Sequence, residues 1–408
     1  MSLPGIDIQF TNGALGSVAP SPDGLLALVC NAAPVASTFE LNTPYLVTSM
    51  EDVAALGIVD DVNNHIVFKT LSEFFAEAGT GTNLWLFAVE RDTVLSDVFK
   101  PGVGGVVPVQ YLLDTANGAI RGIFTAFNPD GSFISDIEDG IESEVTELVT
   151  AAQAFSESYT DTHKAPFFVL TEAYGFDGDI TTLKDWTTSE FNRVGLVIGD
   201  TEERTGTFES QGAAIGVVAG RVASIQVHVN MGKVRDGALR PLKMYMLDDE
   251  INTVNLGAIH DKGYITFRSH VGRSGYFISD DNLATLVSDD YRFLARRRVI
   301  DKAFRVAYGA ILDFLLDDFD TNVDGTISNV YAKSMEGRVV QALFNTMTVN
   351  GELSRDQADA NDFGAIAEID LEHNVIATST IKLKGLQVKP KGYGKFIEVP
   401  LGFVPVTN

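Results

Sequence analysis

The sequence predicts an α/β fold of mixed α+β character, and three observations predict it. Between about residues 40 and 250, short apolar runs alternate with segments of helical periodicity, which is typical of βαβ units that build a sheet covered by helices. Residues 264–319 follow as an aromatic hairpin pattern and a long helical pattern. From Ala365 onward the pattern is almost entirely strand-like. At 408 residues, the chain can hold two or three domains, each with its own core.

The hairpin and helix in residues 264–319 form the most regular stretch of the chain. Residues 264–267 and 276–278 are mostly β-branched or aromatic, and the glycines between them predict a turn. After Tyr291, apolar residues recur every three or four positions, which predicts one buried helix face formed by Ile300, Phe304, Ala307, Ile311, Leu315 and Phe319. Three basic residues fall on the opposite face, namely Arg298, Lys302 and Arg305. The helix is therefore expected to carry an exposed basic stripe.

Outside residues 264–319, the sequence predicts further helices and strands. Helices are expected from Ser49 to Leu56 and over residues 62–78, 137–159 and 327–347, and strands over residues 25–30, 84–89, 119–127, 166–170 and 193–198. Gly212, Gly216 and Gly220 lie on one strip of a further helical segment. That segment is too short to span a membrane, so the glycines indicate close packing of the helix on a sheet.

Alternating strand patterns occur at both ends of the chain. Ile6, Ile8 and Phe10 alternate with polar residues, and no hairpin partner follows nearby. Residues 12–24 are rich in Gly, Ser and Pro and predict an extended arm or loop. Apolar residues alternate again near the C-terminus, at Ile381, Leu383, Ile397, Val399, Leu401 and Phe403. Five lysines in this tail, at positions 382, 384, 389, 391 and 395, either block unwanted strand pairing or steer the strand onto an acidic copy of the protein.

Composition excludes several classes of protein. The net charge of −25 argues against nucleic acid as a partner. The single cysteine, Cys30, cannot form an intrachain disulfide and lies in an apolar setting that predicts a buried thiol. No apolar run reaches the length of a membrane span, and the N-terminus lacks a signal-peptide pattern. We expect a protein that is made and assembled in the cytoplasm without membrane insertion.

Few residues are arranged as catalytic or metal sites. The six histidines are scattered, and neither a Gly-x-Ser-x-Gly elbow nor a Walker-type loop occurs. Asp320, Asn322 and Asp324, followed by a glycine, match the first half of a calcium loop. Position 12 of that loop is Tyr331 rather than glutamate, so a polar turn before a helix capped by Ser328 is the favoured reading. We predict no cofactor, with calcium as the alternative.

Four segments carry a resemblance to a known family. They are residues 220–223 (GRVA), 232–239 (GKVRDGAL), 290–291 (DY) and 298–305 (RVIDKAFR). With the aromatic hairpin among them, the chain resembles the contractile-tail sheath proteins of phages and phage-like contractile injection systems. The resemblance covers residues 212–316, and the β-rich C-terminus agrees with it in kind.

The resemblance implies a structural subunit rather than an enzyme. Sheath proteins of this family form hexameric rings, stacked helically around a tail tube, and contract to drive the tube into a target. Their partners are other copies, the tube, and baseplate and tail-terminator proteins, within a phage virion or injection-system particle. By resemblance, residues 1–34 and 211–408 would form a discontinuous assembly domain, and residues 35–210 an inserted α/β domain that faces outward.

The family also exchanges terminal strands between subunits and faces its tube with a helix. The resemblance thus implies inter-subunit strands that carry Ile6, Ile8 and Phe10 at one end and Ile381, Leu383, Ile397, Val399, Leu401 and Phe403 at the other. It implies tube contacts by Arg298, Lys302 and Arg305. Two other functions stay open: an α/β enzyme with a nucleotide or sugar substrate, which would need titratable residues clustered in the middle region, and a calcium-dependent binding module.

Overall fold

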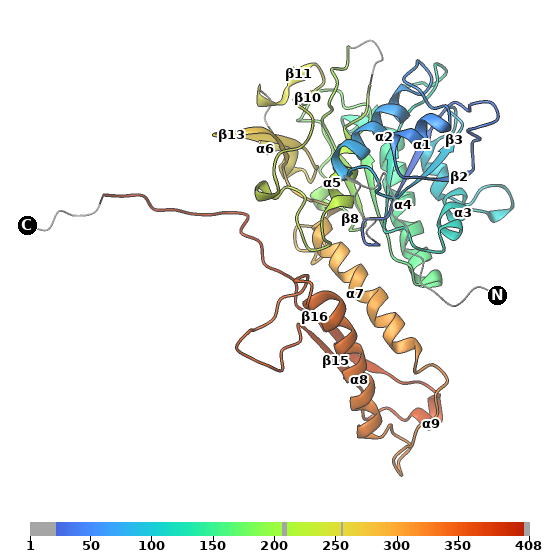
Figure 1. The fold of residues 1–408 in the computed structure, drawn as a ribbon, viewed down its shortest axis with the longest axis vertical. Helices are drawn as coiled ribbons and strands as arrows, with labels where there is room; N and C mark the ends of the chain where they lie inside the picture. Colours follow the sequence, from blue (N-terminus) through green and yellow to red (C-terminus); the bar gives the residue numbers. More distant parts are fainter. Residues whose placement is uncertain (1–21, 206–209, 254–255, 404–408) are drawn as a thin grey trace, which may run out of the picture. The chain divides into compact units, whose positions relative to one another are not determined.

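A computed structural model of the chain describes residues 22–205, 210–253 and 256–403 (Figure 1). Their contacts divide the chain into two units, Met1–Arg305 and Val306–Asn408. The chain passes from the first unit to the second within helix α7, Leu294–Leu312. Helix and strand elements are combined as predicted, so the mixed α/β class is confirmed.

A six-stranded sheet forms the centre of the first unit. Its strands lie in the order β2-β3-β1-β4-β7-β9, and only β2 is antiparallel to its neighbour. They span β1 Leu26–Asn31, β2 Pro44–Val47, β3 Leu84–Val89, β4 Gly122–Ala126, β7 Phe168–Glu172 and β9 Val194–Val197. Strand β1 lies inside the sheet and is buried along its whole length, including Cys30, which explains its unbroken apolar run.

Helices cover both faces of this sheet. Helix α2 (His65–Ala78) and helix α5 (Ile215–Ser224) pack on each other and on β4, and α4 (Ser143–His163) packs on β7 and β9 (Figure 1). Shorter helices are α1 Met50–Ala55, α3 Pro108–Thr115 and α6 Leu256–Asp261. The Ser49 hydroxyl caps α1 by accepting from Asp52 N at 3.3 Å, and Gly79 ends α2 with a φ of 89°.

The glycine strip brings α5 against α2 as well as against the sheet. A Cβ on Gly216 would lie 2.3 Å from Thr70 O, and one on Gly220 would lie 2.7 Å from Phe74 O, both in α2. The predicted packing of this helix on the sheet is confirmed, because α5 contacts β4 and β7. The small residues also let α5 approach the backbone of α2, a contact that the prediction did not include.

Short antiparallel pairs surround the main sheet. The aromatic hairpin is confirmed as β12 (Phe267–His270) and β13 (Arg273–Ile278), and Gly272 has a φ of 78° in the turn between them. The other pairs are β5 Ile137–Glu138 with β6 Ile141–Glu142, β8 Glu190–Phe191 with β14 Ala284–Thr285, and β10 Tyr245–Met246 with β11 Asp249–Glu250. Single helical turns of 3₁₀ type occur at Leu95–Phe99, Val103–Gly105, Trp186–Thr188, Val234–Asp236 and Ile251–Thr253.

The predicted division at residues 34/35 and 210/211 stays a prediction, and the contacts in this structure follow a different division. Strand β1, which was assigned to the terminal domain, lies between β3 and β4 of the supposed insertion. Helix α5, likewise assigned outside the insertion, packs on α2. Parallel strand pairing joins segments that are distant in sequence, so a boundary placed where the local pattern changes divides one core. The boundary that the contacts support lies at Arg305.

The second unit is a helix packed on a two-stranded sheet. Helix α8 (Asn329–Leu343) continues as a π-helical turn, Phe344–Thr348, and packs on β15 (Ala365–Ile369). Strand β15 pairs antiparallel with β16 (Leu383–Val388), and the short helix α9 (Val375–Thr378) lies between them in the chain. One hydrophobic cluster in the core of this unit consists of Ile327, Ala332, Met335, Ile369 and Val375.

Candidate assembly surfaces

Asp23 meets three basic residues of α7 just before β1 begins. Lys302 Nζ lies 2.5 Å from Asp23 Oδ2, and an Arg305 guanidinium nitrogen lies 3.0 Å from Oδ1. Arg298 donates to the Ile225 carbonyl at 3.1 Å and to the Asp23 carbonyl at 3.5 Å. Partial burial raises the pKa of Asp23, but Lys302 and Arg305 outweigh that effect and bring its pKa below the ordinary value.

The prediction that these basic residues form an exposed stripe is therefore wrong. Arg298 is 4% exposed and Lys302 is 8% exposed. A charged side chain is buried only with partners, and Asp23 was too distant in sequence to be foreseen. Contact of Arg298, Lys302 and Arg305 with a tail tube stays a prediction, and it would have to replace their bonds to Asp23.

The apolar face predicted for residues 300–319 is only partly buried: Ala307 is buried, and Ile311 and Phe319 pack on the core of the second unit. The closest-packed side chains of α7 are small: Ala295, Val299, Ala303, Ala307 and Ala310 are buried. Phe304 is 38% exposed and Leu315 is 69% exposed, whereas Ile300, Ile311 and Phe319 are half-buried. Beside the alanines, the Asp301 carboxylate is bonded to Arg297 at 2.6 Å and to Arg193 at 3.2 Å. Apart from Ala307, the prediction placed only large side chains on the buried face, and the other buried alanines were not included.

The predicted terminal strands fall in three different settings. Ile6, Ile8 and Phe10 lie outside the described residues. Leu383 begins β16 and pairs with Ile369 of the same chain, and Ile381 packs half-buried on the core of the second unit. Leu383 therefore belongs to a sheet that could receive a strand. Its pairing with another copy stays a prediction.

The C-terminal arm, residues 391–403, is extended and carries no helix or ladder of strand pairs in the structure. Its alternating apolar side chains face solvent: Ile397 is 81% exposed, Val399 73%, Leu401 97% and Phe403 105%. Phe396 is 91% exposed. Isolated exposed apolar residues are common in proteins, but a continuous exposed row marks an interaction site.

Lys384 and Lys389 of the C-terminal tail pair within the chain at the ends of β16. Lys389 Nζ lies 2.6 Å from Asp362, and Lys384 Nζ lies 3.8 Å from Asp370. Both lysines are about half exposed, so these pairs contribute little to stability. Protection of the strand edge and steering onto another copy both stay predictions.

The calcium-like loop forms a closed turn. The Asp324 carboxylate accepts from the amide and hydroxyl of Thr326, at 3.1 and 2.7 Å, and Asn322 donates to the Ile327 carbonyl. Ser328 caps α8 by accepting from Tyr331 N, as the polar-turn reading predicts. Across the described residues, no group of three or more His, Cys, Asp or Glu side chains is placed to hold a metal ion. Calcium binding through Asp320, Asn322 and Asp324 stays a prediction that a calcium titration would check.

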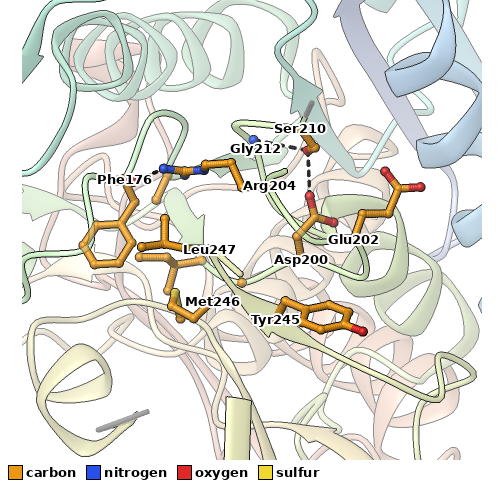
Figure 2. A pocket seen from close by; sticks show the side chains of 12 residues that line it. Phe176, Asp200, Glu202, Arg204, Ser210, Gly212, Tyr245, Met246 and Leu247 are labelled. Carbon is orange, nitrogen blue, oxygen red and sulfur yellow. Dashed lines mark hydrogen bonds between the residues drawn. The ribbon is translucent and has the colours of Figure 1, made fainter. Parts of the chain in front are cut away.

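A pocket lies beside the carboxyl ends of β7 and β9 (Figure 2). Charged side chains line it, and each is bonded elsewhere in the chain. Ser210 donates to Asp200 at 2.7 Å, Arg204 donates to the Phe176 carbonyl at 2.5 Å, and Glu202 lies 2.8 Å from His65 Nε2. Ligands of α/β proteins often bind at this edge of a sheet. Here the charged groups join segments of the chain.

Asp200, which lines the pocket, also belongs to a buried ionic cluster that the sequence did not reveal. Lys69 Nζ lies 2.5 Å from Asp200 and 3.1 Å from Glu73, and all three side chains are nearly inaccessible. Burial lowers the pKa of Lys69, but Asp200 and Glu73 outweigh burial and raise it. The one local signal was the i,i+4 spacing of Lys69 and Glu73, which exposed helices also show. The cluster ties α2 to the chain that follows β9.

A family model described as "DUF2586, N-terminal domain" matches residues 3–282, which is more than half of the chain. The chain belongs to the DUF2586 family. Comparison of this DUF2586 sequence with curated proteins finds no match.

Solved structures share the fold of this DUF2586 chain over nearly its whole length. A chain of the anti-feeding prophage (AFP) baseplate superposes with a TM-score of 0.60 at 16% identity, covering 98% of this chain and 99% of that one. A chain of the contracted PVC sheath complex, an extracellular contractile injection system, gives 0.60 at 13% identity and 98% coverage of both. The sheath tail protein of Desulfitobacterium hafniense gives 0.50 at 12% identity, covering 90% and 94%.

These likenesses show that the DUF2586 chain has the fold of contractile sheath proteins. The resemblance based on residues 212–316 is thereby confirmed, and it extends over both units. Within the described ranges, no helix has both the length and the apolar character needed to cross a bilayer.

Proposed function

We propose that this chain is the structural subunit of a contractile tail sheath. Copies polymerise as hexameric rings stacked helically around a tail tube, and contraction of the polymer drives the tube into a target. The protein acts by assembly rather than catalysis. A fold shared with sheath proteins over 98% of the chain supports this proposal.

The observation that carries the proposal is the C-terminal arm. In residues 397–403, every second residue is a large apolar side chain at least 73% exposed. Such a row costs free energy in water unless a partner covers it. Alternation with a period of two matches a strand that buries one face, so the arm fits addition to the sheet of another copy.

The sheet in the second unit is a suitable acceptor. Strands β15 and β16 are its two members among the described residues, so each has one edge that no described strand covers. Helix α8 packs against β15, while Ile366, which alternates with the buried residues of β15, is 55% exposed. Small sheets gain stability from additional strands and a second covered face. An arm from a neighbouring copy would supply both.

Such exchange explains how a polymer could contract without dissolving. Each subunit would move largely as a rigid body from an extended lattice to a shorter and wider one, with the exchanged strands as hinges. The N-terminal strand with Ile6, Ile8 and Phe10 would make the second link between copies. Tail tube, baseplate and tail-terminator proteins complete the particle, a phage tail or an injection system.

Negative-stain microscopy of the purified chain tests the proposal. We expect tubes or stacked rings from the full chain, and folded subunits that fail to form long polymers after deletion of residues 1–12 or 396–408. Circular dichroism and thermal melting of each deletion variant provide the control for folding. Small discrete oligomers from the full chain, or long tubes from both deletion variants, would contradict the proposal.

A further inference from the structure

Asp23 lies where a force on the N-terminal arm would enter the folded first unit. It follows the residues that we propose to form the N-terminal arm and precedes strand β1, which begins at Leu26 in the middle of the main sheet. Any pull on the arm would reach Asp23 before it reaches β1. The contacts of Asp23 therefore determine whether the pulling force acts on the sheet or on another element.

Those contacts lead to one face of α7. Arg298, Lys302 and Arg305 follow one another at intervals of four and three residues, so their side chains leave the helix on the same side. Lys302 and Arg305 hold the two carboxylate oxygens of Asp23, at 2.5 and 3.0 Å. Arg298 reaches the Asp23 carbonyl and the carbonyl of Ile225 after α5. Charge-assisted bonds with little exposure to water are the strongest polar contacts that side chains make.

The two residues after Asp23 are fixed by backbone contacts. A Cβ on Gly24 would lie 2.3 Å from the Ala223 carbonyl, so the chain passes directly against the end of α5. Arg121 N donates to the Leu25 carbonyl at 2.8 Å, which attaches the chain to the start of β4. Residues 23–25 are thus held from three elements before β1 begins.

We infer that Asp23 and the three basic residues of α7 form an ionic clamp that transmits tension from the N-terminal arm to α7. This inference rests on the proposed strand exchange, because an arm held by a neighbouring copy is what would be pulled. Helix α7 receives the load and continues into the second unit at Val306. The clamp thereby connects the N-terminal link of the polymer to the helix that joins the two units, and it spares the central strand β1.

Single-molecule pulling on one full-length chain tests the clamp without any polymer. Force is applied between the N-terminus and a handle attached at Tyr308→Cys, a position that is 42% exposed, while Cys30 is buried and stays unreacted. We expect Asp23→Asn to raise the rate of β1 extraction at fixed force by roughly tenfold to a hundredfold, the effect of losing one charge-assisted pair. Asp23→Glu keeps the negative charge, so its extraction rate should stay near that of wild type. Lys302→Met removes the basic partner of the same pair and should raise the extraction rate as Asp23→Asn does.

The matched control is Glu77→Gln. The Glu77 carboxylate pairs with Arg221 at 2.7 Å, and both side chains are more deeply buried than those of the Asp23 pairs, but the pair joins α2 to α5 and contacts neither Asp23 nor α7. Its loss should leave the extraction rate within about twofold of wild type. The inference is overturned if β1 is extracted from the Asp23→Asn and Lys302→Met variants at the wild-type rate. It is also overturned if Glu77→Gln raises the extraction rate as much as Asp23→Asn does. Absence of polymers in microscopy would instead refute the proposed function while leaving the pulling result intact.

Discussion

Lys302 Nζ lies 2.5 Å from Asp23 Oδ2, although the two residues are 279 positions apart in the sequence. The contact joins the entrance of the central strand to the helix that leads into the second unit. It also changes how the basic residues of α7 are understood, because a row expected to be exposed is bonded to part of its own chain.

Replacement of Lys302 by methionine is expected to destabilise the subunit. Methionine keeps most of the apolar stem but leaves the Asp23 carboxylate with Arg305 as its remaining side-chain partner at 3.0 Å. Loss of a charge-assisted hydrogen bond with little exposure should lower the free energy of unfolding by about 1–3 kcal/mol. Urea denaturation followed by circular dichroism measures the change.

The control for this variant is Arg338→Met. Arg338 pairs with Asp313 at 3.2 Å, but both side chains are more than 60% exposed. An exposed pair should contribute about 0–1 kcal/mol. Equal losses of unfolding free energy in Lys302→Met and Arg338→Met would show that burial does not strengthen the Lys302 pair.

His65 is expected to make stability depend on pH. Its ring lies 2.6 Å from Asp60 and 2.8 Å from Glu202. Burial lowers the pKa of His65, but the bonds to the two carboxylates outweigh burial and raise it above 6.5. A group whose pKa is higher in the folded state than in the unfolded state stabilises the fold when it is protonated. This stabilisation is complete below the unfolded-state pKa and is lost as the pH rises through the folded-state pKa.

Denaturant unfolding at about pH 6 and about pH 9 checks this expectation. The wild type should lose more unfolding free energy between the two conditions than His65→Gln does. Glu202→Gln removes one partner and should reduce the same pH dependence. A His65→Gln variant with the full wild-type pH dependence would assign the effect to other groups.

Gly216→Ala should destabilise the first unit because the new Cβ would lie 2.3 Å from Thr70 O. The two helices would have to move apart, which costs about 1–3 kcal/mol in a packed interior. Gly309→Ala in α7 is the matched control, since nothing lies within 4 Å of its Cβ. That substitution should instead stabilise by about 0.5–1 kcal/mol through helix propensity. Melting temperatures that move in the same direction would contradict the packing argument.

Local signals allowed much of the first unit to be predicted. Ser49 as a cap, Gly79 as a helix end and the apolar run of β3 each act within a few residues, so the corresponding elements lie where they were expected. The aromatic hairpin follows from the glycines in its turn for the same reason. The likeness to sheath proteins rested on similar short segments.

Long-range partners could not be predicted. The burial of Lys302 depends on Asp23, and the cluster at Lys69 depends on Asp200, and neither partner has a fixed spacing in the sequence. The pairing of β1 with β3 and β4, strands of the expected insertion, likewise has no signal in the local sequence. In each case the local pattern predicted the element correctly but gave no information about what that element contacts. The predictions for the candidate assembly residues were affected most.

The C-terminal arm supplies the sharpest test of the assembly mechanism. Replacing both Ile397 and Leu401 by aspartate puts charge on the apolar row, where the two side chains are 81% and 97% exposed. Because the substituted positions are exposed in the subunit, its melting temperature should stay within about 2 °C of wild type. Burial of either aspartate against another copy would cost several kcal/mol, so long polymers should disappear from micrographs.

Glu398→Gln, on the opposite side of the same strand, is the control and should assemble normally. Glu398 alternates with Ile397 and Val399, so a strand that buries the apolar row would leave position 398 in solvent. Loss of polymers in Glu398→Gln as well would show that the arm does not bind as a one-faced strand. Normal tubes from the double aspartate variant would mean that the exposed row has no part in joining copies.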